Sequence, residues 1–396
     1  MTVLNEPLRP TSKPPRLDSV DLLRGIVMVL MALDHVRDYF TNVRFDPLDL
    51  AQTTAGLFAT RWITHFCAPA FVFLAGTGAF LSTTRGKSKV DLSRFLFTRG
   101  LWLVFVELTI VRFGWLFNLD YHLAIAQVIW VIGWSMVVLA ALVFLSTRTI
   151  TIFGVAMIIL HNLLDSVTPE QLGVFNDWWK ILHVGGPVEF ISGHYLLVAY
   201  PLIPWVGVMA AGYGLGSMLL AEENKRRKSL AWLGIGLTGA FILIRASKLY
   251  GDPLGWSMQQ NALLTFFSFI HCQKYPPSLL YLLITLGPAI AMLPLLERWK
   301  GKAAEFFIVF GRVPMFYYIL HIPFIHALAV VAAYATGFDP SWMFANSPPW
   351  EWPAGYGFSL PIVYLVWTGV IVALFPVCKW YAGVKSRSKS SWLSYL

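Results

Sequence analysis

The sequence is poor in charged residues and in cysteine. Of its 396 residues only 13% are charged, whereas a soluble globular domain usually carries about 25%. This composition excludes a disordered chain, a basic nucleic-acid-binding protein and an ordinary soluble enzyme. The three cysteines are scattered and form no CxxC pair, which argues against a disulfide framework or a zinc site. The polar, proline-rich segment 1–15 lacks the apolar core of a cleavable signal peptide, so we expect a short disordered cytoplasmic tail.

Hydrophobic residues make up 57% of the chain and recur in runs of about 20, the length that crosses a bilayer as a helix. We therefore predict an all-α fold, a polytopic transmembrane helix bundle, over residues 16–384. About ten spans are expected, at 19–40, 61–83, 95–116, 122–146, 149–165, 194–220, 229–249, 277–297, 313–336 and 358–380. The stretch 258–271 is short for a span, and 303–311 is typical of an interfacial helix. Either stretch leaves room for an eleventh span.

The Lys and Arg residues support this layout, because cytoplasmic loops of membrane proteins are enriched in both. Every second predicted loop is basic, including the run 225–228 and the tail 385–396. An even number of spans with both termini in the cytoplasm satisfies the alternation. We therefore interpret the net charge of +9 as a signal of membrane topology. For any single basic loop segment, the alternative interpretation is binding of anionic lipid or nucleotide.

The first predicted span carries six ionisable side chains, namely Asp21, Arg24, Asp34, His35, Arg37 and Asp38. At about 100° per residue, all except Arg37 share one face of the helix. Ionisable groups within a membrane helix normally face the bundle interior and a functional site. His35 follows Arg24 by eleven residues, which is about 16 Å along the axis and places it toward the non-cytoplasmic face. Arg24 is either paired structurally with Asp21 or a substrate-binding residue.

Asp34 and Asp38 are spaced i,i+4, so their carboxylates should repel each other unless a cation lies between them. Arg37 and His35 are both placed to neutralise them. A carboxylate beside His35 would orient its ring and tune it as a base. We predict His35, Asp34 and Asp38 as catalytic residues and Arg37 as a substrate contact, the alternative being a cluster that only balances charge near the membrane interface.

The second predicted span places Arg61 and His65 on one face, at the depth of His35. Arg61 is a candidate partner for the two carboxylates and a candidate substrate contact, and His65 is a second candidate base. No recognised ligand spacing joins these histidines, and we expect no metal. Among the remaining histidines, His321 in the ninth span is the best candidate for substrate binding, although a hydrogen-bonded bundle histidine is the default interpretation.

Several motifs resemble one membrane protein family. The opening Arg16-Leu-Asp-Ser-Val-Asp-Leu-Leu-Arg-Gly25 is similar to its R-x-x-S-(I/V)-D-x-x-R-G pattern, and 69–76 resembles its P-x-F-x-F-x-x-G. The stretches 33–40, 200–216 and 313–328 resemble its uncharacterised bacterial members. This family is the heparan-α-glucosaminide N-acetyltransferase catalytic-domain family, within the transmembrane acyltransferases.

The resemblance implies a multi-pass acyltransferase with acetyl-CoA or a related acyl-CoA as donor. In the characterised animal members an acetyl group crosses the lysosomal membrane to a glucosamine amine, and the active-site histidine lies between the first two spans. Residues 41–60 contain no histidine, so that residue has no positional match here. His35 and His65 flank the gap, and either could take its role. The departure also leaves the heparan substrate open.

The sequence therefore favours an acyltransferase that moves an acetyl or similar group to a sugar or other small acceptor at the non-cytoplasmic side. The expected setting is a bacterial inner membrane, with no nucleic-acid partner. The alternative is a multi-pass transporter of a small polar or anionic solute. Transporters often carry internal repeats with matching broken helices, and residues 194–396 show no repeat of the first-span motif.

Overall fold

The computed structural model describes residues 17–84, 86–346, 352–388 and 393. The predicted tail 1–15, and most of the tail 385–396, lie outside these residues. The described chain is mostly helical, as predicted. Its long helices are α1 (Asp18–Phe40), α3 (Cys67–Thr83), α4 (Lys89–Val106), α6 (Val128–Leu142), α7 (Thr147–Leu160), α9 (Leu202–Met218), α10 (Glu223–Ser247), α12 (Leu279–Leu296), α14 (Pro314–Ala335) and α15 (Leu360–Arg387).

Shorter elements connect the long helices or extend their ends. The short helices and turns of helix are α2 (Ala55–Ile63), η1 (Thr64–Phe66), η2 (Glu107–Val111), α5 (Arg112–Leu116), η3 (His161–Leu164), η4 (Pro169–Phe175), α8 (Asn176–Trp179), η5 (Lys180–Val184), α11 (Ala262–Ile270), α13 (Lys302–Arg312) and η6 (Pro340–Phe344). The strands are β1 (Leu123–Ala126), β2 (Gly186–Ile191) and β3 (His194–Val198).

Six helical segments of the described chain are long and apolar enough to cross a membrane, namely Ala55–Thr83, Thr147–Leu164, α10, α12, α14 and α15. Two further predicted spans, α6 and α9, are apolar but shorter. The remaining two, α1 and the α4–η2–α5 segment, are helical and carry charged side chains. Each predicted span thus contains a helix, whereas the count of ten and the cytoplasmic side of both termini stay predictions.

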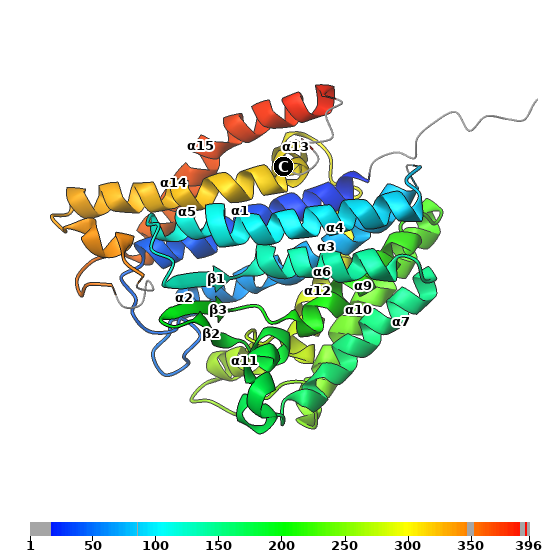
Figure 1. Ribbon diagram of the computed structural model, residues 1–396, viewed down its shortest axis with the longest axis horizontal. Helices are drawn as coiled ribbons and strands as arrows, with labels where there is room; N and C mark the ends of the chain where they lie inside the picture. The colour runs from blue at the N-terminus through cyan, green and yellow to red at the C-terminus, as the bar shows by residue number, and fades with distance from the viewer. Residues whose placement is uncertain (1–16, 85, 347–351, 389–392, 394–396) are drawn as a thin grey trace, which may run out of the picture.

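A small sheet corrects the strictly all-α class, because the predicted spans 122–146 and 194–220 begin with β1 and β3 rather than with helix. The strand order is β1-β3-β2, with β1 parallel and β2 antiparallel to β3. Helix α9 does not extend back into β3, because its N-cap Pro201 has an extended backbone and proline has no amide hydrogen to continue a helix. Figure 1 shows the sheet in the half of the molecule away from the start of α1.

The two uncertain apolar stretches resolve differently. The range 258–271 contains only α11, nine residues that are too short to cross a bilayer. The range 303–311 forms α13, the short helix that the sequence predicted. Helix α13 lies across the beginning of α1, so the described part of the chain offers no eleventh span at either place.

Helix α1 runs through the middle of the bundle (Figure 1) and crosses α13 at backbone contact. A Cβ at Gly25 would lie 1.8 Å from the Phe307 carbonyl oxygen, so only glycine permits this approach. Arg24 Nη1 donates to the Gly311 carbonyl and to Asp21 Oδ1, both at 3.2 Å. The opening motif of the chain therefore joins α1 to α13.

Helix α6 depends on a carboxylate from its neighbour. Helix α4 widens into the π-helical turn η2 at Glu107, whose side chain is 1% exposed. The Trp130 amide in the first turn of α6 donates to Glu107 Oε2 at 3.0 Å. Glu107 thus supplies an acceptor to amides that have no partner within their own helix.

Candidate functional site

The bundle contains two large cavities that lie end to end. The larger, about 1170 Å³, is lined by Asp18 near the start of α1 and by Lys385 near the end of α15. We name it the basic cavity, since its wall includes six cationic and two acidic side chains, namely Arg24, Arg99, Lys302, Arg312, Lys379, Lys385, Asp18 and Glu305. The second, about 790 Å³, is lined by His35 and is named the His35 cavity.

The two cavities adjoin along α1 and α6. In α1, Met28 lines the basic cavity and Met31, one turn later, lines the His35 cavity. In α6 the same change occurs between Ile129 and Val128. The helix order therefore places the His35 cavity nearer the end of α1, toward the loops that the charge pattern assigns to the non-cytoplasmic side.

A paired charge cluster lies in the wall of the His35 cavity. Asp34 accepts hydrogen bonds from Arg61 Nη1 at 2.7 and 2.8 Å. Arg37 Nη2 lies 3.0 Å from Asp34 Oδ1 and 2.6 Å from Asp38 Oδ1. The two predictions on charge are confirmed: a cation lies between the i,i+4 carboxylates, and Arg61 is a partner of Asp34. Arg37 reaches both carboxylates although its Cα lies off the polar stripe, because its side chain is long.

His35 lies beside this cluster and lines the cavity. Its Nδ1 is 3.8 Å from Asp38 Oδ2, too far for a hydrogen bond, and has no other hydrogen-bond partner among the described residues. The ring packs edge-on against Trp115 at 4.8 Å between centroids. His35 is therefore held in place by packing, and its buried Nδ1 has no hydrogen-bond partner among the described residues.

The other two predicted histidines lie behind the cavity wall. His321 packs against His35 at 5.2 Å between ring centroids, and its Nδ1 donates to the Tyr318 carbonyl at 2.8 Å. His65 is 2% exposed and lies between Thr64 and Cys67, which line the cavity although His65 does not. The structure thus brings His321 to His35 and keeps His65 apart from the cavity.

Arg24 is the one predicted site residue at a distance from this group. It lines the basic cavity, where it also donates to Asp21 and the Gly311 carbonyl. The structural pairing of Arg24 with Asp21 is confirmed. Its predicted role in substrate binding stays a prediction.

Several cavity residues were not singled out from the sequence. Lys274 is 8% exposed and, with Tyr275, adds a cation and a hydroxyl to the wall. Arg44 donates to the Thr41 carbonyl at 3.0 Å and to the Tyr356 carbonyl at 2.7 Å. Both cations stand alone in predicted non-cytoplasmic loops, which carry few others, and this isolation is the signal that could have marked them.

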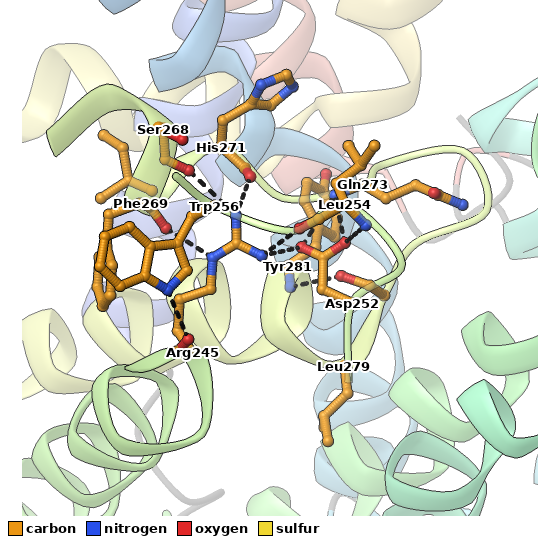
Figure 2. A network of polar contacts seen from close by, with 12 residues as sticks. Arg245, Asp252, Leu254, Trp256, Ser268, Phe269, His271, Gln273, Leu279 and Tyr281 are labelled. Carbon is orange, nitrogen blue, oxygen red and sulfur yellow. Dashed lines mark hydrogen bonds and ion pairs between the residues drawn. The ribbon is translucent and has the colours of Figure 1, made fainter. Parts of the chain in front are cut away.

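The loop that carries Lys274 is fixed by a buried ion pair (Figure 2). Arg245 Nη1 lies 3.0 Å from Asp252 Oδ2, and the two side chains are 3% and 0% exposed. Arg245 also donates to the carbonyls of Phe269 at 2.9 Å and His271 at 2.7 Å, at the end of α11. Burial raises the pKa of Asp252, and the Arg245 guanidinium acts in the opposite direction. The network therefore holds the backbone at His271, three residues before Lys274 in the chain.

Among the described residues, no group of three or more His, Cys, Asp or Glu side chains is placed to hold a metal ion. The His35 cavity offers an imidazole, paired carboxylates and cations. A base beside oriented carboxylates suits proton transfer from an amine or hydroxyl.

Comparison with known proteins identifies the family. The sequence model of the catalytic region of heparan-alpha-glucosaminide N-acetyltransferase matches residues 16–247. A comparison with curated proteins finds no match. The matched range contains α1 through α10, with the charge cluster and His35, whereas Lys274 and His321 lie beyond it. Since the match spans more than half of the chain, the protein belongs to the heparan-alpha-glucosaminide N-acetyltransferase catalytic family, a family of membrane acetyltransferases.

Proposed function

We propose that this protein transfers an acetyl group from acetyl-CoA, bound in the basic cavity, to a small acceptor in the His35 cavity. The observation that carries the proposal is the meeting of a cationic cavity with a base-containing cavity inside one bundle. The basic residues in every second predicted loop support a donor site on the cytoplasmic side and an acceptor site on the opposite side. The proposed setting is a bacterial inner membrane.

The basic cavity suits the donor on grounds of charge and size. CoA carries several phosphate groups, and Arg and Lys side chains are the usual partners of phosphates in proteins. Six cationic side chains line this wall. No Gly-rich phosphate loop occurs in the sequence, so side-chain cations are the groups available for the task.

His35 would act as the general base on the acceptor. The acceptor amine or hydroxyl attacks the thioester carbonyl carbon and gives its proton to the imidazole. The carbon–sulfur bond then breaks, and the imidazolium returns the proton to the CoA thiolate. Asp38, 3.8 Å from His35 Nδ1, would stabilise the imidazolium, and Arg37 and Arg61 hold the carboxylates in position.

Purified protein reconstituted in liposomes, with acetyl-labelled acetyl-CoA and a panel of amino sugars, tests this function. We expect label in the acceptor together with one free CoA thiol per transfer. A transporter, the alternative class, would use the same two cavities and move solute across the vesicle membrane without forming a new acetyl product. Solute movement without any labelled product would replace the enzyme proposal by the transport one.

A further inference from the structure

Two residues belong to the walls of both cavities. Among the described residues, only Phe71 of α3 and Tyr318 of α14 line both the basic cavity and the His35 cavity. These two residues therefore mark the place where the two cavities adjoin. Phe71 offers only hydrocarbon, whereas Tyr318 offers a hydroxyl at the junction.

The Tyr318 hydroxyl is buried without a protein partner. The residue is 3% exposed, and no hydrogen bond to its hydroxyl forms among the described residues. Buried polar groups are normally hydrogen-bonded, because an unpaired one loses its hydration without compensation. Tyr318 is therefore a residue at the junction of the two cavities whose hydroxyl is bound by no protein group among the described residues.

The surroundings of Tyr318 connect it to the proposed base. Its ring packs against His321 at 5.4 Å between centroids, and His321 packs against His35 at 5.2 Å. The Tyr318 carbonyl also accepts the His321 Nδ1 hydrogen bond at 2.8 Å. One turn of α14 thus fixes Tyr318 beside the same ring that backs His35.

We infer that the Tyr318 hydroxyl is a catalytic group that donates a hydrogen bond to the carbonyl oxygen of the acetyl thioester. This inference rests on the proposed function. When the acceptor nitrogen or oxygen bonds to the carbonyl carbon, the carbonyl electron pair moves to oxygen. Tyr318 stabilises that oxyanion without giving up its proton, until the carbon–sulfur bond breaks and the carbonyl reforms.

The adjacent tyrosine provides a matched control. Tyr317 is 0% exposed and its hydroxyl also lacks a hydrogen-bond partner among the described residues, yet it lines neither cavity. Tyr318→Phe and Tyr317→Phe therefore remove the same atom from the same helix. They differ in access to the cavity junction.

The experiment measures acetyl transfer by both variants in the liposome assay, with thermal unfolding as the test of folding. We expect Tyr318→Phe to lower kcat about 100-fold, as loss of one oxyanion donor does elsewhere, with the KM for acetyl-CoA unchanged. Tyr317→Phe should match the parent. Both variants should unfold at or above the parent temperature, because each loses an unpaired polar group.

Three results would overturn the inference while leaving the enzyme in place: parental kcat in Tyr318→Phe, an equal loss in both variants, or a change confined to KM. Marked destabilisation of Tyr318→Phe would also overturn it, since the hydroxyl would then have a structural partner. A parent protein that transfers no label to any acceptor would overturn the proposed function itself, and this role of Tyr318 with it.

Discussion

The two candidate bases differ in access to the acceptor. His35 lines the cavity, whereas His65 is enclosed between residues that line it, although each has a buried ring nitrogen without a partner among the described residues. A base must come within hydrogen-bond reach of the proton it removes, or act through one water molecule. Geometry therefore favours His35, which the sequence alone left level with His65.

Replacing the base should separate the two histidines. We expect His35→Ala to lower kcat by about 100-fold to 10,000-fold, the range usual for loss of a general base. His65→Ala should retain transfer, since its imidazole does not reach the cavity. The measurement is initial-rate kinetics on both variants in the liposome assay. Activity that survives His35→Ala and disappears with His65→Ala would reverse the assignment.

A third histidine makes the fold sensitive to acid. Burial lowers the pKa of His271, with Arg245 and Arg61 acting in the same direction and Asp46 opposing. The unfolded chain therefore binds the proton more readily, with a pKa of about 6.5. The contribution of neutral His271 to stability is therefore complete above that pH and falls as the pH decreases below it.

We therefore expect cleavage of the loop around His271 by a protease to accelerate between about pH 7.5 and 5.5. His271→Gln should show a smaller acceleration, because glutamine takes up no proton. Cleavage rates are divided by those of an unfolded substrate, which corrects for the protease itself. An equal acceleration in parent and variant would contradict the assignment.

At the scale of elements, the helices meet at backbone distance where glycine permits it. A Cβ at Gly76 of α3 would lie 1.9 Å from the Met209 carbonyl oxygen of α9, and one at Gly212 of α9 would lie 2.0 Å from the Phe73 carbonyl oxygen. Small residues of this kind drive helix association in membranes, where neighbouring lipid offers no hydrophobic advantage.

One helix offers both a test and its control. Gly76→Ala should destabilise the protein by about 1–3 kcal/mol or more, since α3 and α9 must move apart. A Cβ at Gly78, two residues on, meets no atom within 4 Å, so Gly78→Ala should be neutral or slightly stabilising. Thermal unfolding in detergent measures both. Equal effects would show that α3 and α9 do not cross as described.

The arginine network of Figure 2 offers a second test at this scale. Arg245→Met leaves the Asp252 carboxylate buried without its counter-ion, which should cost about 3–5 kcal/mol. The double variant Arg245→Met/Asp252→Leu removes both charges and should recover much of that loss. Thermal unfolding of the two single variants and the double variant measures the coupling. Additive losses would indicate that the pair is not buried together.

At the scale of the whole molecule, function depends on which cavity faces which side. The basic cavity lies between the first residues of α1 and the last turns of α15, so its opening follows the orientation of both ends of the described chain. One predicted span, 194–220, lies between the exposed residues Glu170 and Lys225, so the predicted topology puts them on opposite faces of the membrane.

Labelling of introduced cysteines tests this topology. The three native cysteines are buried and should react slowly with a maleimide, so background labelling should be low. In intact cells, a membrane-impermeant maleimide should label Glu170→Cys and spare Lys225→Cys until the membrane is opened. The opposite pattern would place the basic cavity outside and would rule out the proposed donor side.

Much of the fold and part of the site follow from local pattern. The polar face of α1 follows from the spacing of Asp21, Arg24, Asp34 and Asp38, and the Arg37 bridge from like charges one turn apart. The strands β1 and β3 did not follow, because short, mainly apolar stretches with few β-branched residues suit a helix or a strand equally. The position of His65 behind the cavity wall could not be predicted from the sequence either. Helical spacing predicts which residues share a face of the helix, but not which elements pack against that face.

The sequence by itself determined the membrane class, the helices, the charge cluster of α1 and the family, because each depends on composition or on residues a few positions apart. Only the tertiary structure decided what meets that cluster. Lys274, Tyr318 and His321 lie more than 230 positions beyond His35, and chain spacing carries no record of such contacts. Helix packing brings them to the surroundings of His35, where the proposed acceptor would bind.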